Sequence, residues 1–141
     1  MYVWLEITII IARILIEAVF FAIGASIFSF LNVVIYRLPR KIQFVGGSSM
    51  CTSCHHELVT KDLIPIISWI SLKGKCRYCG EKISVRYTIV ETIGGVSAVL
   101  CTLFIGINIW ALIAFLISGV VVVAGYIIYD KVRDKDPEKV G

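Results

Sequence analysis

Four cysteines are the residues of this 141-residue chain whose types and spacing most directly suggest chemistry. Cys51, Cys54, Cys76 and Cys79 form the pattern C-x2-C-x21-C-x2-C. Two such pairs can present four thiolates to one zinc ion in a tetrahedron, and each pair then closes a tight turn over the metal. Gly80 follows the second pair and suits such a turn, because glycine accepts backbone angles that other residues resist. The pattern therefore predicts a structural zinc site.

Redox chemistry and free thiols are the competing interpretations, because a single CxxC pair at a helix N-terminus can exchange disulfides. Two pairs at this spacing in a basic loop argue against redox chemistry. The loop is expected to be cytoplasmic, as its charge indicates below, and the reducing cytoplasm disfavours structural disulfides. His55 and His56 adjoin Cys54 and offer substitute ligands, although histidines in such positions are more often solvated. Cys101 lies in an apolar run, so we interpret it as a small packing residue.

Three apolar runs must position these cysteines. They cover Ile14–Tyr36, Tyr87–Ile107 and Ile109–Tyr129, and each is 21 to 23 residues long. About 20 helical residues cross the hydrocarbon core of a bilayer, so each run predicts a transmembrane helix. The first helix can slide toward the N-terminus, where apolar residues continue. Only Gly106 and Asn108 interrupt the apolar sequence around the boundary of the last two runs, which predicts a tight helical hairpin.

Composition supports a membrane protein, with 58% hydrophobic and 17% charged residues. A signal peptide is the alternative for the N-terminus, but no basic segment precedes the apolar residues. Arg13 and Glu17 also fall where the apolar core of a signal peptide should be unbroken. These two residues are one helical turn apart, so we expect them to pair at the end of the first span.

Positive charge is concentrated between the first two spans. Residues 37–86 hold nine of the 14 Lys and Arg residues and three of the ten acids, a net charge of +6 in a chain whose net charge is +4. By the positive-inside rule this loop is cytoplasmic, the N-terminus is outside and the C-terminus is inside. The charge is therefore interpreted as a topology signal, and the expected partner is a lipid bilayer, with no nucleic acid.

These observations predict a mainly α membrane protein with three transmembrane helices and a small zinc-ribbon-like loop between helices 1 and 2. The expected segments are an N-terminal transmembrane helix, a cytoplasmic four-cysteine loop, a transmembrane helical hairpin and a polar cytoplasmic tail. Their ranges are 1–36, 37–86, 87–129 and 130–141.

The residues around the cysteine pairs carry a resemblance to a known family. SFLNVVIYRLPR, then SxxCxxC, then DLIPIISWISLKGKCRYCGEKISVRYTIVE follow in order between about Gly24 and Gly95. This region resembles the N-terminal region of type IV prepilin peptidases. The resemblance implies a multi-pass aspartic endopeptidase of the bacterial plasma (inner) membrane, which cuts a basic leader from prepilins on the cytoplasmic side. Many members also N-methylate the new amino terminus, and by resemblance alone S-adenosylmethionine is a further cofactor.

The resemblance further implies two catalytic aspartates that share a proton and activate a water. Asp130 matches the first, with Pro137 and Glu138 at the family's offsets and Glu where Asp is usual. A polar tail that merely begins with Asp is the alternative, and it stays open. The GxGD motif of the second aspartate is not found in the sequence. We therefore expect this chain to need a partner chain with GxGD, and not to cleave prepilins alone.

Glu91 lies within the second span, where an acid is costly and suggests a role. A structural pairing near Arg86 and Tyr87 is the favoured interpretation, and a site against Ser29 and Asn32 that holds a substrate amine during methylation is the alternative. Two function classes follow for the whole chain. It is the N-terminal portion of a prepilin peptidase, or it is a non-catalytic zinc-loop membrane protein that binds prepilins or pilus and secretion assembly components.

Overall fold

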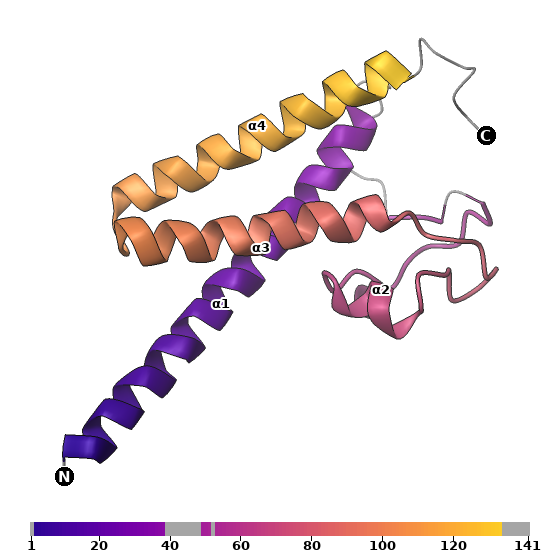
Figure 1. The fold of residues 1–141 in the computed structure, drawn as a ribbon. Helices are drawn as coiled ribbons and strands as arrows, with labels where there is room; N and C mark the ends of the chain where they lie inside the picture. The colour runs from indigo at the N-terminus through magenta and orange to yellow at the C-terminus, as the bar shows by residue number, and fades with distance from the viewer. Residues whose placement is uncertain (1, 39–48, 52, 134–141) are drawn as a thin grey trace.

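Four α-helices and one short 3-10 helix make up the part of the chain that the computed structural model describes, residues 2–38, 49–51 and 53–133 (Figure 1). The elements in chain order are α1 (Tyr2–Arg37), η1 (Thr60–Asp62), α2 (Ile67–Ser71), α3 (Val85–Ile105) and α4 (Ile109–Arg133). Helices α1, α3 and α4 are long and apolar enough to cross a membrane, and the four-cysteine loop lies between α1 and α3. The predicted mainly α membrane fold is confirmed.

Helices α1 and α3 pack in opposite directions over the C-terminal half of α1. Along α1, Glu17 meets Thr102, Gly24 meets Gly94, and Ser29 meets Glu91 near the start of α3. A Cβ atom on either glycine would overlap the backbone of the other, so the two glycines let the helix backbones approach closely. In lipid such close van der Waals packing takes the place of the hydrophobic effect between helices.

Helix α4 returns along the other two helices and completes a small apolar core. Phe28, Val90, Ala98 and Phe115 are buried in this core and come from all three long helices. The rings of Phe28 and Phe115 have centroids 5.7 Å apart at 48°, a favourable tilted arrangement of aromatic pairs. The outward faces of the three helices carry many exposed Ile, Leu and Val side chains, as expected for surfaces that face lipid.

Asn108 closes the turn between α3 and α4 with its side chain. Its Oδ1 accepts hydrogen bonds from the N–H groups of Trp110 (2.9 Å) and Ala111 (3.1 Å), and its Nδ2 donates to the carbonyl of Ile105 (2.7 Å). Gly106 ends α3 with φ at 85°, a backbone angle that favours glycine. The tight hairpin expected from this segment is therefore present.

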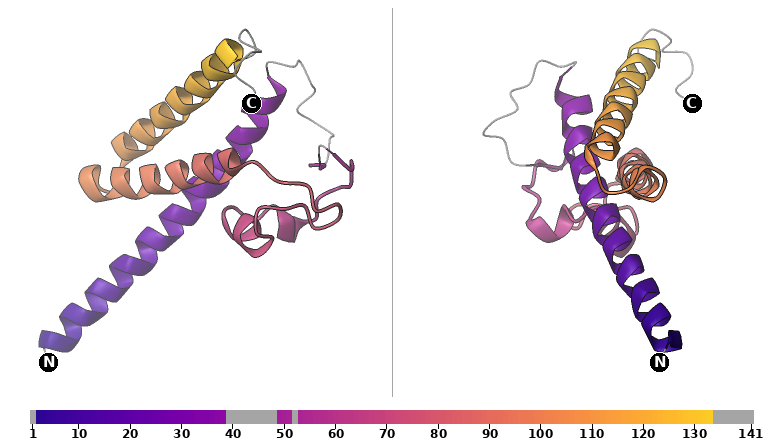
Figure 2. Two further views of the ribbon diagram at one scale, coloured as in Figure 1. Left: turned by 45° about the vertical axis from the view of Figure 1, so that its right-hand side comes forward. Right: turned by 90° about the vertical axis from the view of Figure 1, so that its left-hand side faces the viewer.

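Three details differ from the sequence-based expectations. Helix α1 begins at Tyr2 and its N-terminal part extends away from the other helices (Figure 2). Helix α4 includes Asp130, which was assigned to the tail, whereas residues 134–141 lie outside the described residues. No ion pair joins Arg13 to Glu17 among the described residues, because Glu17 faces α3 and accepts a hydrogen bond from the Thr102 hydroxyl at 2.7 Å.

Candidate metal centre and carboxylate sites

The two cysteine pairs form the same backbone turn twice. In the first turn, the N–H group of His55 donates to the carbonyl of Cys51, and in the second, the N–H group of Gly80 donates to that of Cys76, each at 3.0 Å. His55 and Gly80 therefore occupy equivalent positions, and both have positive φ, 55° and 73°. Each turn is enclosed by an isolated antiparallel bridge, formed by Met50 with Glu57 and by Lys75 with Lys82.

The repeated turns bring the four cysteine sulfurs together. All four Sγ atoms lie within 4.8 Å of one another, and those of Cys51 and Cys79 are 3.8 Å apart. In a tetrahedral site with Zn–S bonds of about 2.3 Å, two sulfurs are about 3.8 Å apart. The four side chains thus fit a single metal ion, and a set of four thiolates is one that zinc favours.

Backbone amides favour the thiolate form of Cys51. The N–H groups of Cys54 and Ser53 point to its sulfur and lower its pKa from 9.0 to about 6. At Cys79 the backbone of Glu81 acts in the same direction, but desolvation and the neighbouring thiols outweigh it and raise the pKa to about 12. A metal ion must therefore displace protons from the cluster, and Cys51 loses its proton more readily than Cys79.

Neither histidine belongs to the sulfur cluster among the described residues. Both side chains are exposed, as expected for solvated neighbours of the cysteines. The ring of His56 stacks on that of Tyr78, with centroids 3.6 Å apart, and so links the two turns. His55 contributes to the first turn through its backbone, which has positive φ and donates a hydrogen bond to the carbonyl of Cys51.

The segment between the cysteine pairs is braced by its own side chains. Arg77 Nη2 lies 2.7 Å from Asp62 Oδ1, and Trp69 Nε1 donates to the carbonyl of Ile83 at 3.1 Å. Gly74 has φ at 67° and lies against the indole of Trp69, which a Cβ atom would overlap. The role of Asp62 was not predicted from the sequence because its partner Arg77 is 15 residues away in the chain, and that of Gly74 was not predicted because it depends on how the Trp69 side chain folds back.

Asp130 lies in the last turns of α4 and is held by Arg86 from the first turn of α3. Arg86 Nη1 donates to Oδ1 and Oδ2 of Asp130 at 3.0 Å each. The guanidinium group also lies 5.4 Å from the centre of the Tyr126 ring, in cation–π range. The side chains of Arg86 and Asp130 are 24% and 19% exposed. The candidate catalytic carboxylate is therefore a partly buried ion-pair partner, beside the point where the four-cysteine loop enters α3.

Glu91 faces α1 and the four-cysteine loop. Its Oε1 accepts a hydrogen bond from the Ser29 hydroxyl (2.6 Å), and its Oε2 accepts one from the backbone N–H of Ile66 (2.8 Å). Only 8% of Glu91 is exposed. The favoured pairing of Glu91 with Arg86 is wrong, because Arg86 points to α4. The contact with Ser29 was the alternative, and the contact with Ile66 was not foreseen.

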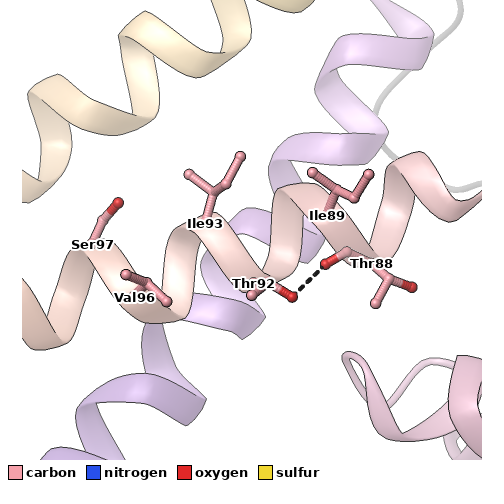
Figure 3. A pocket seen from close by; sticks show the side chains of 6 residues that line it. All are labelled: Thr88, Ile89, Thr92, Ile93, Val96 and Ser97. Atoms are coloured by element: carbon pink, nitrogen blue, oxygen red, sulfur yellow. Dashed lines mark hydrogen bonds between the residues drawn. The ribbon is translucent and has the colours of Figure 1, made fainter.

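Two shallow apolar grooves run along α3, and each measures about 360 to 370 Å³. The first is lined by α3 alone, and Figure 3 shows the hydrogen bond from Thr92 to the Thr88 carbonyl among its lining residues. The second lies between α1 and α3 and includes Arg13 and Glu17. Neither groove contains the cysteines, Asp130 or Glu91, so the candidate chemistry lies outside both.

Comparison with known proteins covers the four cysteines, Arg86 and Glu91, whereas Asp130 lies beyond the matched family region. A family model described as the bacterial peptidase A24 N-terminal domain matches residues 22–105. The prepilin leader peptidase/N-methyltransferase of Myxococcus xanthus (strain DK1622) is 43% identical over 81 residues, 57% of this chain and 24% of that protein. The protein of the same name from Vibrio cholerae serotype O1 is 48% identical over 71 residues, 45% of this chain and 28% of that protein.

A longer match is found with the type 4 prepilin-like proteins leader peptide-processing enzyme of Escherichia coli O78:H11. It is 34% identical over 125 residues, 76% of this chain and 46% of that protein. This chain thus spans less than half the length of these relatives. No solved structure matches it. The matched family region runs from α1 through the four-cysteine loop to the end of α3 and covers more than half of the chain, which therefore belongs to the bacterial peptidase A24 N-terminal domain family.

Proposed function

We propose that this chain is the N-terminal portion of a prepilin peptidase and takes part in cleaving the leader peptides of type IV prepilin-like proteins. The placement of Asp130 carries the proposal. The ion pair with Arg86 holds this carboxylate at the end of the helices where the four-cysteine loop joins α3. The matched family region, residues 22–105, includes Arg86 but not Asp130, and relatives named prepilin leader peptidase/N-methyltransferase support the proposal through their similarity to this chain.

In the proposed orientation the four-cysteine loop is cytoplasmic, in the bacterial plasma (inner) membrane. The concentration of basic residues between α1 and α3 supports this placement through the positive-inside rule. The N-terminus then lies outside and the C-terminus inside. Asp130 and Arg86 lie at the cytoplasmic boundary, where a carboxylate can meet the basic leader of a prepilin.

Aspartic peptide hydrolysis needs two carboxylates that share a proton and activate a water molecule. Asp130 supplies one of them in this proposal, and a second membrane chain with a GxGD motif supplies the other. In this proposal the two carboxyls together remove a proton from the attacking water and return one to the leaving amine.

The four cysteines hold a structural zinc ion in this proposal. The ion fixes the two turns of the loop to each other and takes no part in peptide hydrolysis. Purified protein is expected to contain about one zinc per chain by mass spectrometry of the metal. Zinc should be lost when Cys51 and Cys79 are both changed to Ser. The variant Cys101→Ser is the matched control and should retain the metal.

The same ion pair is also compatible with the second candidate function, a non-catalytic membrane protein that uses the zinc loop to bind prepilins or pilus and secretion assembly components. Both oxygens of Asp130 are engaged by Arg86, which is the arrangement of a structural ion pair as well as of an oriented carboxylate. In this alternative Asp130 only closes the end of the helices, and the chain binds substrate without cutting it.

The deciding experiment is co-expression of this chain with a GxGD-containing membrane protein from the same genome and a prepilin-like substrate. We expect leader cleavage only when both chains are present. Asp130→Asn should abolish cleavage, and Asp134→Asn, four residues along the chain, is the matched control that should leave it intact. The mass of the product also shows whether its new amino terminus is methylated. S-adenosylmethionine is proposed as the methyl donor on the family resemblance alone.

Full cleavage by the Asp130→Asn variant would exclude the catalytic role of this residue. Substrate capture by this chain without cleavage, with every GxGD partner supplied, would instead support the binding protein. The two outcomes are separable because capture is measured by co-purification and cleavage by the mass of the substrate.

A further inference from the structure

The backbone at Ile66 is strained in the middle of the four-cysteine loop. Ile66 has φ at 63° and ψ at −51°, and the N–H group of Ile67 donates to the carbonyl of Pro65 at 2.5 Å. This three-residue turn is the rare, strained form of the γ-turn. A β-branched residue at positive φ is an outlier that persists only where the surroundings impose it.

Glu91 is the group that meets this strained turn. The N–H group of Ile66, which the turn leaves pointing out of the loop, donates to Glu91 Oε2 at 2.8 Å. The other carboxylate oxygen accepts the hydroxyl of Ser29, on α1, at 2.6 Å. One buried carboxylate on α3 therefore connects the loop to both helices of the close-packed α1–α3 pair.

Neighbouring polar groups reinforce the same junction. Asn32 is 2% exposed, lies one helical turn beyond Ser29 on α1, and donates from Nδ2 to the carbonyl of Tyr87 at 3.2 Å. The α1–α3 contact is thus hydrogen-bonded on successive turns next to the point where the loop docks. The loop itself is braced by the bond from Trp69 to the carbonyl of Ile83. Glu91 therefore lies where the four-cysteine loop contacts the α1–α3 pair, and both are held by further hydrogen bonds of their own.

We propose that Glu91 is a positioning residue, which docks the four-cysteine loop onto the α1–α3 pair by holding the Ile66 turn. Arg86 and Glu91 lie on successive turns of α3, and Arg86 holds Asp130 whereas Glu91 holds the loop. The first two turns of α3 therefore set the distance between the loop and the Asp130 carboxylate. The consequence for peptide cleavage rests on the proposed function, but the docking itself does not.

Hydrogen–deuterium exchange of the zinc-loaded full chain in lipid nanodiscs tests the docking. Glu91→Ala should speed amide exchange at Ile66 about tenfold, because the amide loses its acceptor and the turn relaxes. Exchange in the second cysteine turn and the zinc content should not change. Glu91→Gln should restore protection, since its carbonyl can accept from Ile66 while its amide donates to Ser29.

Two further variants keep the test decisive. Glu17→Ala is the matched control, because this membrane-level acid bonds to Thr102 and does not touch the loop; exchange at Ile66 should be unchanged. If Glu91→Ala does not fold, Glu91→Asp keeps a carboxylate but is one methylene too short to reach both donors. It should then speed exchange at Ile66 in the same way as the alanine variant.

Activity provides the second measurement, in the two-chain cleavage assay. Glu91→Ala should lower kcat/KM about tenfold, in proportion to the lost docking, and Glu91→Gln should recover most of it. Unchanged exchange at Ile66 in both Glu91→Ala and Glu91→Asp overturns the docking proposal. Absence of cleavage by the wild-type pair overturns the proposed function instead, and the exchange result still decides the role of Glu91.

Discussion

Arg86 and Asp130 join the first turn of α3 to the last turns of α4 through an ion pair in which one guanidinium nitrogen lies 3.0 Å from both carboxylate oxygens. The same two helices are joined at their other ends by the turn that Asn108 closes. The helical hairpin is therefore fastened at both ends. The ion pair fixes the position of Asp130 whether this carboxylate cleaves peptides or only stabilises the fold.

Removal of Arg86 should destabilise the hairpin. Arg86→Gln leaves the Asp130 carboxylate without its partner in a partly buried site, which should lower the free energy of unfolding by about 1–3 kcal/mol. The measurement is denaturant unfolding in mixed micelles, followed by tryptophan fluorescence. Lys131→Gln, an exposed neighbour, is the control and should change stability by less than about 0.5 kcal/mol.

The same prediction has a stricter form in a double-mutant cycle. The double variant Arg86→Gln/Asp130→Asn should be less destabilised than the sum of the two single variants, because the neutral pair leaves no charge unpaired. Additive losses would show that the two side chains do not interact in the membrane.

The equivalence of His55 and Gly80 predicts opposite effects of two substitutions on metal binding. His55→Gly removes the cost of positive φ from the first turn and should tighten zinc binding by up to about fivefold. Gly80→Ala adds that cost to the second turn, and because no atom lies within 4 Å of the added Cβ, backbone strain alone should weaken binding about fivefold or more. Competition with a fluorescent chelator measures both affinities.

His55→Asn separates backbone strain from the loss of the imidazole. Asparagine tolerates positive φ about as well as histidine, so this variant should bind zinc within about twofold of the wild type. If His55→Asn weakens zinc binding as much as Gly80→Ala does, the His55 side chain contributes to the metal site.

Cys51 should be more reactive than Cys79 in the metal-free protein. Its pKa is lowered to about 6, so its thiolate predominates at pH 7 and is lost as the pH falls through about 6. The same lowering stabilises the metal-free loop fully above pH 9.0, and this contribution disappears through about pH 6. Timed alkylation at pH 7, followed by peptide mass spectrometry, should label Cys51 before Cys79, whose pKa is raised to about 12.

Zinc-loaded protein is the control for this experiment, and alkylation of all four cysteines should then be slow. Labelling of Cys79 ahead of Cys51 in the metal-free protein would contradict the arrangement of backbone N–H groups around the Cys51 sulfur.

The Gly24–Gly94 contact predicts a strong dependence on side-chain size. Gly24→Ala places a Cβ atom into the backbone of α3, so the helices must separate; we expect a loss of about 2 kcal/mol or more. Gly125→Ala is the matched control, because no atom lies within 4 Å of its added Cβ and alanine favours a helix. In thermal unfolding in detergent, the Tm of Gly125→Ala should equal or exceed that of the wild type. Equal Tm values for Gly24→Ala and Gly125→Ala would refute the close packing of α1 on α3.

The sequence predicts the parts of this structure that depend on local pattern. Apolar runs of sufficient length predict α1, α3 and α4, and repeated CxxC spacing predicts the sulfur cluster. Gly106 and Asn108 predict the hairpin turn, since their conformational and hydrogen-bonding properties act within a few residues.

Contacts between distant residues were not predictable in the same way. Arg86 was assigned to Glu91 because the two are close in sequence, but the return of α4 brings Asp130 to it instead. The strain at Ile66 has no sequence signal, because isoleucine disfavours positive φ and the acceptor of its N–H group, Glu91, is 25 residues away in the chain. The sequence thus predicts the parts of the site that are built from neighbouring residues. It does not predict the parts that are built from residues brought together by folding.

The length of α1 has a consequence for the membrane in which this protein works. A helix of 36 residues is about 54 Å long, whereas the hydrocarbon core of a bilayer is about 30 Å thick. Helix α3 has 21 residues, matches that thickness, and crosses α1 near Gly24. If the hydrocarbon core matches the length of α3, the whole of α1 fits inside it only when α1 is strongly tilted from the bilayer normal. Bilayer thickness therefore acts on this protein chiefly through α1, and thicker membranes should accommodate it with less tilt.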